Sequence, residues 1–181
     1  MRVGLFGGSF NPPHMGHALA CFYLLETTKL DCIWLVPTFK HAFSKTLAPY
    51  EDRLEMCRLL ARSFNERMKV SEIESAHNGI SYTIDTVRSL QALHPELEFD
   101  WIIGADILAE TERWKDFDTL QTLIRFRVIG RQGFPGLGGI EIPRVSSSEV
   151  RRRLHDGESV RELVSADVLA FIGRRGLYRA P

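Results

Sequence analysis

Two histidines stand three residues apart near the start of the chain, shortly after a glycine pair. His14 and His17 follow Gly7-Gly8, and a helix that starts near Met15 would place both imidazoles in its first turn. Free backbone N–H groups and the helix dipole favour an anion at such a position. The alternative is an ordinary glycine turn followed by surface or capping histidines. As a group, these residues predict a polyphosphate site at which the glycine pair turns the chain sharply and lets the backbone approach the ligand.

A second group near the other end of the chain has the same kind of chemistry. Ser146, Ser147 and Ser148 precede Glu149 with the Ser-x-x-Glu spacing of a capping box, and Arg151 follows one turn later. Hydroxyls and free N–H groups at a helix start can hold phosphate oxygens, and an arginine can reach them as a two-pronged donor. The alternative is a serine-rich N-cap with a solvated arginine. Two helix starts of this kind, more than a hundred residues apart, predict two walls of one nucleotide site.

The composition limits the class of protein. The 181 residues are 44% hydrophobic, with 23 Lys+Arg and 23 Asp+Glu, which predicts one globular domain over 1–181 whose C-terminal helical part, about 146–181, packs on the same core. Because the charges balance, we expect a local anion site and no nucleic-acid partner. Cys21, Cys32 and Cys57 lie in apolar segments without C-x-x-C spacing and indicate reduced core thiols. No signal peptide or long apolar run is evident, which predicts a cytoplasmic protein without a membrane partner.

Apolar runs and helical periodicities alternate along the chain. We expect strands at 2–6, 31–36, 68–71, 99–103, 126–129 and 140–142. We expect helices at 18–27, 49–64, 81–93, 105–112, 117–124, 146–157 and 165–174, with a hinge around Trp114. In the first of these helices Leu19, Phe22 and Tyr23 fall along one side. This alternation predicts an α/β fold with a doubly wound parallel sheet.

The first group of residues resembles a known signature. Gly8-Ser9-Phe10-Asn11-Pro12-Pro13-His14-Met15-Gly16-His17 matches G-x-F-x-P-x-H-x-G-H, the HxGH motif of the nucleotidylyltransferase superfamily. Val145 to Arg151 is similar to the I-S-S-T/S-x-I-R signature that the same superfamily has near its end. The resemblance implies a Rossmann-like nucleotidylyltransferase fold and ATP as a substrate, held with Mg²⁺ and without metal ligands from the protein.

Further segments resemble one family within this superfamily. Ser81-Tyr82-Thr83, Ile103-Gly104-Ala105-Asp106, Trp114 and Gly176-Leu177-Tyr178-Arg179 look like bacterial nicotinate mononucleotide adenylyltransferases, in the same order and at similar spacing. The resemblance implies transfer of AMP from ATP to nicotinate mononucleotide, which gives nicotinate adenine dinucleotide and pyrophosphate in NAD biosynthesis.

The resemblance also implies roles for individual residues. Tyr82, Thr83 and Trp114 would bind the acceptor, with the indole stacked on the nicotinate ring and backbone amides near Thr83 meeting its carboxylate. Asp106 would bind the ribose of ATP and Arg131 would lie near the adenine. The catalytic residues implied are His14, His17, Lys45 and Arg151, and the ATP-binding residues are Gly7, Gly8, Ser9, Phe10, His14, Gly16, His17, Gly104, Asp106, Arg131, Ser146, Ser147, Ser148 and Arg151.

Several of these residues also have a purely structural interpretation, and some segments depart from the family pattern. Trp114 could fill a gap between helices, and Asp106 could cap a helix. The loop after the second strand lacks the usual P-P-H-K, so Lys45 is the expected phosphate ligand and Lys40 the alternative. The segment before Trp114 lacks a proline that the family often has there.

Other functions stay open at this point. An adenylyltransferase acting on nicotinamide mononucleotide is the nearest alternative, and one acting on phosphopantetheine is a weaker one. A non-catalytic ATP-binding regulatory protein would belong to a different class. A homo-oligomer is compatible with the sequence, which does not specify the oligomeric state.

Overall fold

A parallel sheet forms the centre of the molecule. The computed structural model describes residues 1–40, 47–77, 79–134 and 140–180. The strands are β1 (Arg2–Gly8), β2 (Cys32–Pro37), β3 (Met68–Val70), β4 (Glu98–Gly104), β5 (Arg125–Arg131) and β6 (Glu141–Ile142). Their order in the described sheet is β3-β2-β1-β4-β5-β6, and every pair of neighbours is parallel. The order reverses beside β1, which confirms the expected doubly wound arrangement and places a ligand crevice at the carboxyl ends of β1 and β4.

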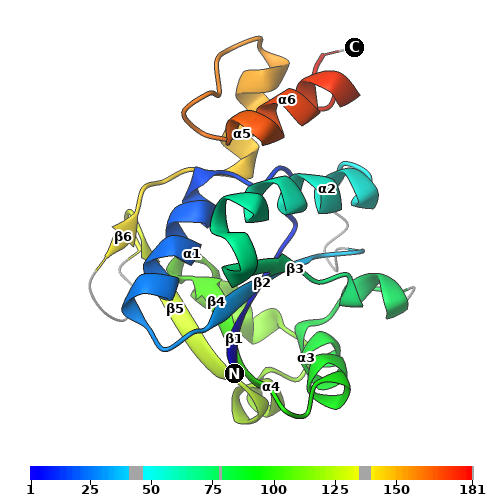
Figure 1. The fold of residues 1–181 in the computed structure, drawn as a ribbon, viewed down its shortest axis with the longest axis vertical. Coiled ribbons are helices and arrows are strands. Elements are labelled where there is room, and N and C mark those ends of the chain that lie inside the picture. Colours follow the sequence, from blue (N-terminus) through cyan, green and yellow to red (C-terminus); the bar gives the residue numbers. More distant parts are fainter. Residues whose placement is uncertain (41–46, 78, 135–139, 181) are drawn as a thin grey trace.

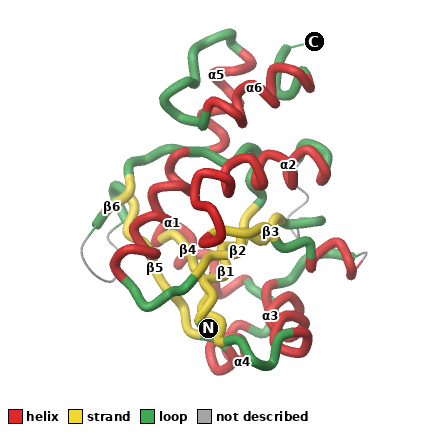
Figure 2. Tube along the Cα trace, viewed as in Figure 1, coloured by secondary structure: helices red, strands yellow, loops and turns green. Residues whose placement is uncertain are grey.

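Helices cover both faces of this sheet (Figure 1). The α-helices are α1 (Met15–Thr27), α2 (Tyr50–Ala61), α3 (Thr83–Leu93), α4 (Phe117–Leu123), α5 (Ser147–His155) and α6 (Ala166–Arg175). Three 3₁₀ segments, η1 (Arg62–Arg67), η2 (Ile73–His77) and η3 (Ala105–Arg113), connect them. Figure 2 shows how helices flank the strands and how loops join them at the sheet's two ends. No helix among the described residues combines the length and the apolar character that crossing a bilayer requires.

The alternation of side chains along β1 divides the core into two layers. Val3 and Leu5 pack with α3 and α4 on one face, whereas Phe6 packs with α1 and α2 on the other. A third apolar cluster joins the outer side of α2 to α5 and α6, with Met56 and Val150 both fully buried. α2 therefore lies between the sheet and the two C-terminal helices, as Figure 1 shows. The single-domain organisation stays a prediction.

α1 does not turn toward the sheet the side on which the sequence places Leu19, Phe22 and Tyr23. Leu19 is 40% and Phe22 59% exposed, while Cys21 and Leu25 are buried against the sheet. Gly16, Ala18, Ala20 and Cys21 are buried on the side toward the sheet, and these small side chains let the helix approach the strands closely. All three cysteines are buried and free, as expected.

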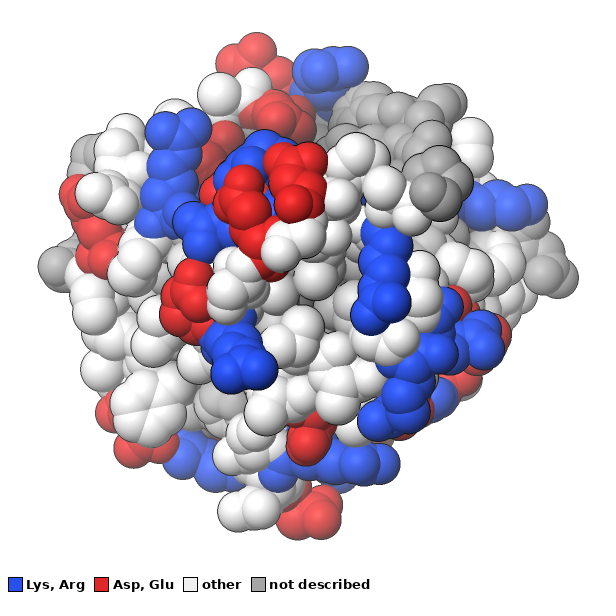
Figure 3. Space-filling view, turned by 90° about the horizontal axis from the view of Figure 1, so that it is seen from above, with Lys and Arg blue, Asp and Glu red and all other residues white. Residues whose placement is uncertain are grey.

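The ends of the C-terminal helices follow their predicted signals. Ser146 Oγ accepts a hydrogen bond from Glu149 N at 3.1 Å, so the predicted N-cap of α5 is confirmed. Gly157 follows α5 with a φ of 74°, and Gly176 caps α6 with a φ of 63°, a left-handed conformation that glycine adopts without strain. On the face seen from above α5 and α6, basic and acidic side chains are interspersed (Figure 3), in keeping with the ion pairs that Arg152 makes with Glu149 and Glu158.

Gly7 shows how closely β1 and β4 pack. A Cβ on Gly7 would overlap Cζ2 of the buried Trp101 indole and lie 2.9 Å from its Cη2. We therefore expect Gly7→Ala to lower the free energy of unfolding by about 1–3 kcal/mol, measured by urea denaturation, because a rigid ring cannot yield to the extra methyl.

Gly173→Ala is the matched control for Gly7→Ala. Gly173 is an exposed residue of α6, and a Cβ there would come no closer than 3.9 Å to a neighbouring side chain. The free energy of unfolding of this variant should rise by up to about 1 kcal/mol, because alanine has a higher helix propensity than glycine. A Gly7→Ala protein as stable as the wild type would contradict the packing described.

Candidate functional site

The chain turns after β1 later than the sequence suggested. Gly7 and Gly8 continue the strand and pair with Val36 and Pro37 of β2, so the prediction of a sharp bend at the glycine pair is wrong. The left-handed residue is Phe10, with a φ of 43°. The glycines belong to the strand because Gly7 must fit against the Trp101 ring, a long-range contact that local sequence does not reveal.

The two histidines lie at the start of α1, as predicted. His14 is the N-cap residue, and its backbone N donates to His17 Nδ1 at 3.1 Å. The rings stack with centroids 3.8 Å apart and an interplanar angle of 29°. The His17 ring also lies 4.9 Å from that of Phe10. His14 Nδ1 is buried and has no hydrogen-bond partner, a costly state that a ligand with acceptor oxygens would relieve.

Burial keeps both imidazoles neutral. It lowers the pKa of His14 to about 3, with the positive charge of Arg131 adding to the effect. Burial also holds the pKa of His17 well below its usual value, with His14 and Arg131 as further causes. In the ligand-free protein the pair therefore offers hydrogen-bond donors rather than charge.

The start of α5 is bonded to the turn after β1. Ser147 Oγ donates to Pro12 O at 2.9 Å, and Arg151 Nη1 donates to Asn11 O at 2.7 Å. Arg151 Nη2 also donates to Ser148 Oγ at 3.2 Å. The two predicted phosphate-binding helix starts thus meet, although Arg151 uses its guanidinium on the turn itself.

Asp106 and Arg131 lie side by side at the ends of β4 and β5. Arg131 Nη1 donates to Asp106 Oδ2, and Nη2 donates to Val145 O. The expected ribose ligand and the expected neighbour of adenine therefore form an ion pair in the ligand-free protein.

An aromatic group lies at the other end of the site. Trp114 is half-buried, and its ring contacts Phe117 and Phe126 at centroid distances of 6.1 and 6.3 Å. Nearby, Lys115 Nζ lies 4.8 Å from the centroid of the Tyr82 ring. Phe117 and Phe126 thus fix the plane of the indole, and Tyr82, the N-cap residue of α3, lines the same cavity.

One cavity of about 610 Å³ joins these groups. The predicted site residues that line it are Gly7, Gly8, Ser9, Phe10, His14, Gly16, His17, Tyr82, Thr83, Gly104, Asp106, Trp114, Arg131, Ser146 and Ser147. Ser148 and Arg151 lie beside it without lining it. Lys45 falls outside the described residues, and the alternative Lys40 is exposed and does not line the cavity.

Sequence reasoning missed several charged residues in the lining, namely Glu74, Glu110, Arg113 and Lys115. Arg113 and Lys115 flank Trp114, so their proximity to the acceptor side could have been inferred from that residue. Glu74 lies in η2, whose contacts with the site are long-range, and no local signal marks it. Among the residues that the structure describes, no three His, Cys, Asp or Glu side chains are arranged to hold a metal ion.

The chain is similar to known proteins over nearly its whole length. Residues 5–153 match the Cytidylyltransferase-like family. The chain is 47% identical to a probable nicotinate-nucleotide adenylyltransferase of Anaeromyxobacter dehalogenans, over 98% of this chain and 97% of that protein. It is 39% identical to the protein of the same name in Myxococcus xanthus, over 98% and 95% of the two chains.

A solved structure has the same fold. The nicotinic acid mononucleotide adenylyltransferase of Plasmodium falciparum, complexed with NaAD, superposes with a TM-score of 0.83 at 22% identity, over 98% of this chain and 97% of that one. The likeness covers the sheet and the C-terminal helices together.

The neutral histidines predict a pH-dependent stability. His14 and His17 stay deprotonated in the folded protein, whereas in the unfolded chain they titrate near pH 6.5. Their contribution is complete above pH 6.5 and is lost as the pH falls toward the folded values. Urea denaturation should show a loss of about 2 kcal/mol from His14 between pH 7.5 and 5, and a further loss in the same direction from His17.

The double variant His14→Gln/His17→Gln should lose this part of the pH dependence. His155→Gln, which changes an exposed histidine of α5 that contacts Asp156, is the comparison variant and should still show the loss that His14 and His17 cause. If the double variant has the same slope as the wild type, the two imidazoles are not the buried neutral groups described.

Proposed function

Because the chain belongs to the nicotinate-nucleotide adenylyltransferases, we propose that it transfers AMP from ATP to nicotinate mononucleotide, forming nicotinate adenine dinucleotide and pyrophosphate. The reaction belongs to NAD biosynthesis. The alternatives are the same transfer to nicotinamide mononucleotide or, less well supported, to phosphopantetheine.

The observation that supports the proposal most is the shared cavity. One space of about 610 Å³ is lined by the His14–His17 pair, by the start of α5 and by Tyr82, Thr83 and Trp114. A nucleoside triphosphate and an aromatic mononucleotide therefore have adjoining subsites. A protein that only senses ATP would have no need of the second one.

On the ATP side, hydrogen-bond donors converge on the triphosphate. Nδ1 of His17 accepts a hydrogen bond from the backbone N–H of His14. The proton of the neutral His17 ring therefore lies on Nε2, which can donate to the α-phosphate. His14 and Arg151 hold the outer phosphates, and one of these would replace Ser148 Oγ as a partner of Arg151. The ribose binds Asp106, and adenine lies near Arg131.

On the acceptor side, the first turn of α3 favours a carboxylate. Free N–H groups and the positive end of the helix dipole at Thr83 stabilise a negative charge, which nicotinate has and nicotinamide lacks. The nicotinate ring stacks on the Trp114 indole, whose plane Phe117 and Phe126 fix.

The chemistry requires positioning more than covalent help from the protein. A phosphate oxygen of the acceptor attacks the α-phosphorus in line, a new O–P bond forms, and the bond to the bridging oxygen breaks with its electron pair leaving on pyrophosphate. The acceptor phosphate is already ionised, so no general base is needed. When bound with ATP, Mg²⁺ would supply positive charge that offsets the negative charge of the phosphates.

The proposal extends to the setting of the enzyme. We place it in the cytoplasm, with ATP and nicotinate mononucleotide as small-molecule partners and no nucleic acid or membrane. A homo-oligomer is compatible with this function.

A direct assay tests the acceptor. Mg²⁺-ATP is supplied with nicotinate mononucleotide, nicotinamide mononucleotide or phosphopantetheine, and pyrophosphate release is measured for each. We expect the nicotinate compound to have a kcat/KM at least about 10-fold above that of the amide, because its charge is worth about 1.5–3 kcal/mol at a hydrogen-bonded site.

The outcomes separate the parts of the proposal. Equal turnover of the two pyridine nucleotides would remove the acceptor assignment and leave the chemistry intact. No pyrophosphate from any acceptor would support the regulatory alternative instead.

A further inference from the structure

A buried arginine in α2 bonds three separate segments of the chain. Arg53 is 1% exposed and is the largest fully buried side chain among the described residues. Its Nε donates to Ala48 O at 3.0 Å, Nη1 to Ser9 O at 2.9 Å and Nη2 to Phe39 O at 3.4 Å. A buried guanidinium is costly unless its donors are satisfied, so this side chain strongly favours the arrangement in which all three carbonyls converge on it.

A buried carboxylate holds the same segment from the other side. Glu74 is 6% exposed and accepts from Phe39 N at 3.1 Å and from Thr86 Oγ1 at 3.1 Å. Burial raises the pKa of Glu74, while hydrogen bonds from Ser81, Phe39 and Thr86 and the charge of Arg53 oppose the shift. The backbone N–H of Phe39 thus donates to the buried carboxylate of Glu74, and its carbonyl accepts from the buried guanidinium of Arg53.

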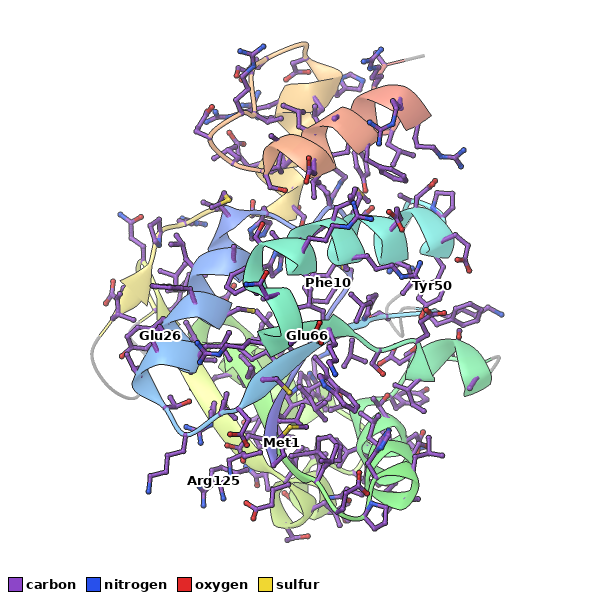
Figure 4. The ribbon with its side chains drawn as sticks, in the orientation of Figure 1. Met1, Phe10, Glu26, Tyr50, Glu66 and Arg125 are labelled. Carbon is purple, nitrogen blue, oxygen red and sulfur yellow. The ribbon has the colours of Figure 1, made fainter. Side chains whose placement is uncertain are left out.

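Phe39 in turn is joined to the segment that precedes α3. Ser81 Oγ accepts from Phe39 N at 3.2 Å and from Lys40 N at 3.4 Å, and Ser81 N donates to Lys40 O at 3.0 Å. The Phe39 ring packs edge-on against Tyr50, at a centroid distance of 5.0 Å. Figure 4 labels Tyr50 at the start of α2, together with Phe10 beneath the same helix.

These contacts link the two sides of the cavity. Ser9 belongs to the turn on the ATP side, whereas Ser81 belongs to the acceptor side, and both line the cavity. Glu74 also lines it, while Arg53 does not and reaches both sides from behind. The relative position of the two subsites therefore depends on the Arg53–Phe39–Glu74 contacts.

We propose that Arg53 and Glu74 are positioning residues that fix the acceptor subsite relative to the ATP turn through the backbone of Phe39. This inference rests on the adenylyl transfer proposed above. A misplacement of about 1 Å between the reacting groups can cost about 100-fold in rate, so we expect a kinetic effect although Arg53 does not line the cavity.

Two conservative variants test the proposal. Glu74→Gln keeps the size of the side chain but replaces one acceptor oxygen with a donor, and Arg53→Lys keeps the charge but loses the forked geometry. Arg127→Lys is the matched control, because Arg127 pairs with the buried Asp100 on β4 and neither residue lines the cavity. Pyrophosphate release is measured with each substrate varied in turn, and urea denaturation reports stability.

The two variants should differ in their kinetics. Glu74→Gln should raise KM for the acceptor about 10-fold with KM for ATP changed by less than about 2-fold, because Glu74 bonds only the acceptor side. Arg53→Lys should lower kcat about 10-fold or more, since Arg53 bonds Ser9 on the ATP side and Phe39 on the acceptor side. Arg127→Lys should lower stability and leave both KM values unchanged. In the double variant Arg53→Lys/Glu74→Gln the loss should be smaller than the product of the single losses, because both act through Phe39.

The opposite results would be clear. If Arg53→Lys and Glu74→Gln lose stability as Arg127→Lys does and keep the wild-type KM and kcat, Arg53 and Glu74 have a purely structural role. If their effects multiply, they do not act through one peptide. Should Arg53→Lys fail to fold, the KM split of Glu74→Gln decides. A wild type without turnover on any acceptor contradicts both this inference and the proposed function, whereas an active wild type with unchanged variants contradicts this inference alone.

Discussion

The turn after β1 is held in place by groups from the far end of the chain, and the site depends on this attachment. Asn11, which is 2% exposed, accepts from Arg151 through its carbonyl and from the Tyr178 hydroxyl through Oδ1, the latter at 2.8 Å. Ser147 binds the next carbonyl, that of Pro12. A buried acceptor left without its donor costs about 1–3 kcal/mol, so α5 and the turn form one unit. The two helix starts converge for this reason, and not because they are near in sequence.

The charges of the site fit this construction. The imidazoles are buried and neutral, while Arg131 is paired with Asp106 and its charge opposes protonation of both histidines. If the triphosphate binds as proposed, its negative charge would raise the pKa of both histidines, so anion binding and proton uptake would be linked. Among the residues that the structure describes, His14 and His17 thus provide donors without positive charge, and the charge of Arg131 is paired. Preorganised donors of this kind act on charge that develops in the transition state.

Much of the fold could be predicted because its signals are local. Six apolar runs, with helical periodicities between them, predicted an α/β fold with a doubly wound parallel sheet. Ser146, Gly157 and Gly176 marked the ends of helices through their own backbone or side-chain chemistry. The HxGH residues could be placed at a helix start for the same reason. Features set by packing were not predictable in this way. The Trp101 ring keeps Gly7 in the strand, and close packing of α1 turns Phe22 outward.

The residues that sequence reasoning missed have distant partners. Glu74 and Arg53 bond backbone groups that come together only in the folded chain, and nothing in their neighbouring residues distinguishes them from surface charges. Arg151 was predicted from its motif, but its bond to Asn11 depends on how α5 docks. A motif therefore identifies the groups that meet the substrate more readily than those that hold these groups in position.

The central claim is that the triphosphate lies between the first turns of α1 and α5. A crystal structure with Mg²⁺ and a non-hydrolysable ATP analogue tests it most directly. We predict phosphate oxygens at about 2.7–3.2 Å from His17 Nε2 and from the first N–H groups of α5. A triphosphate bound elsewhere, with only solvent between the two helix starts, would contradict the account.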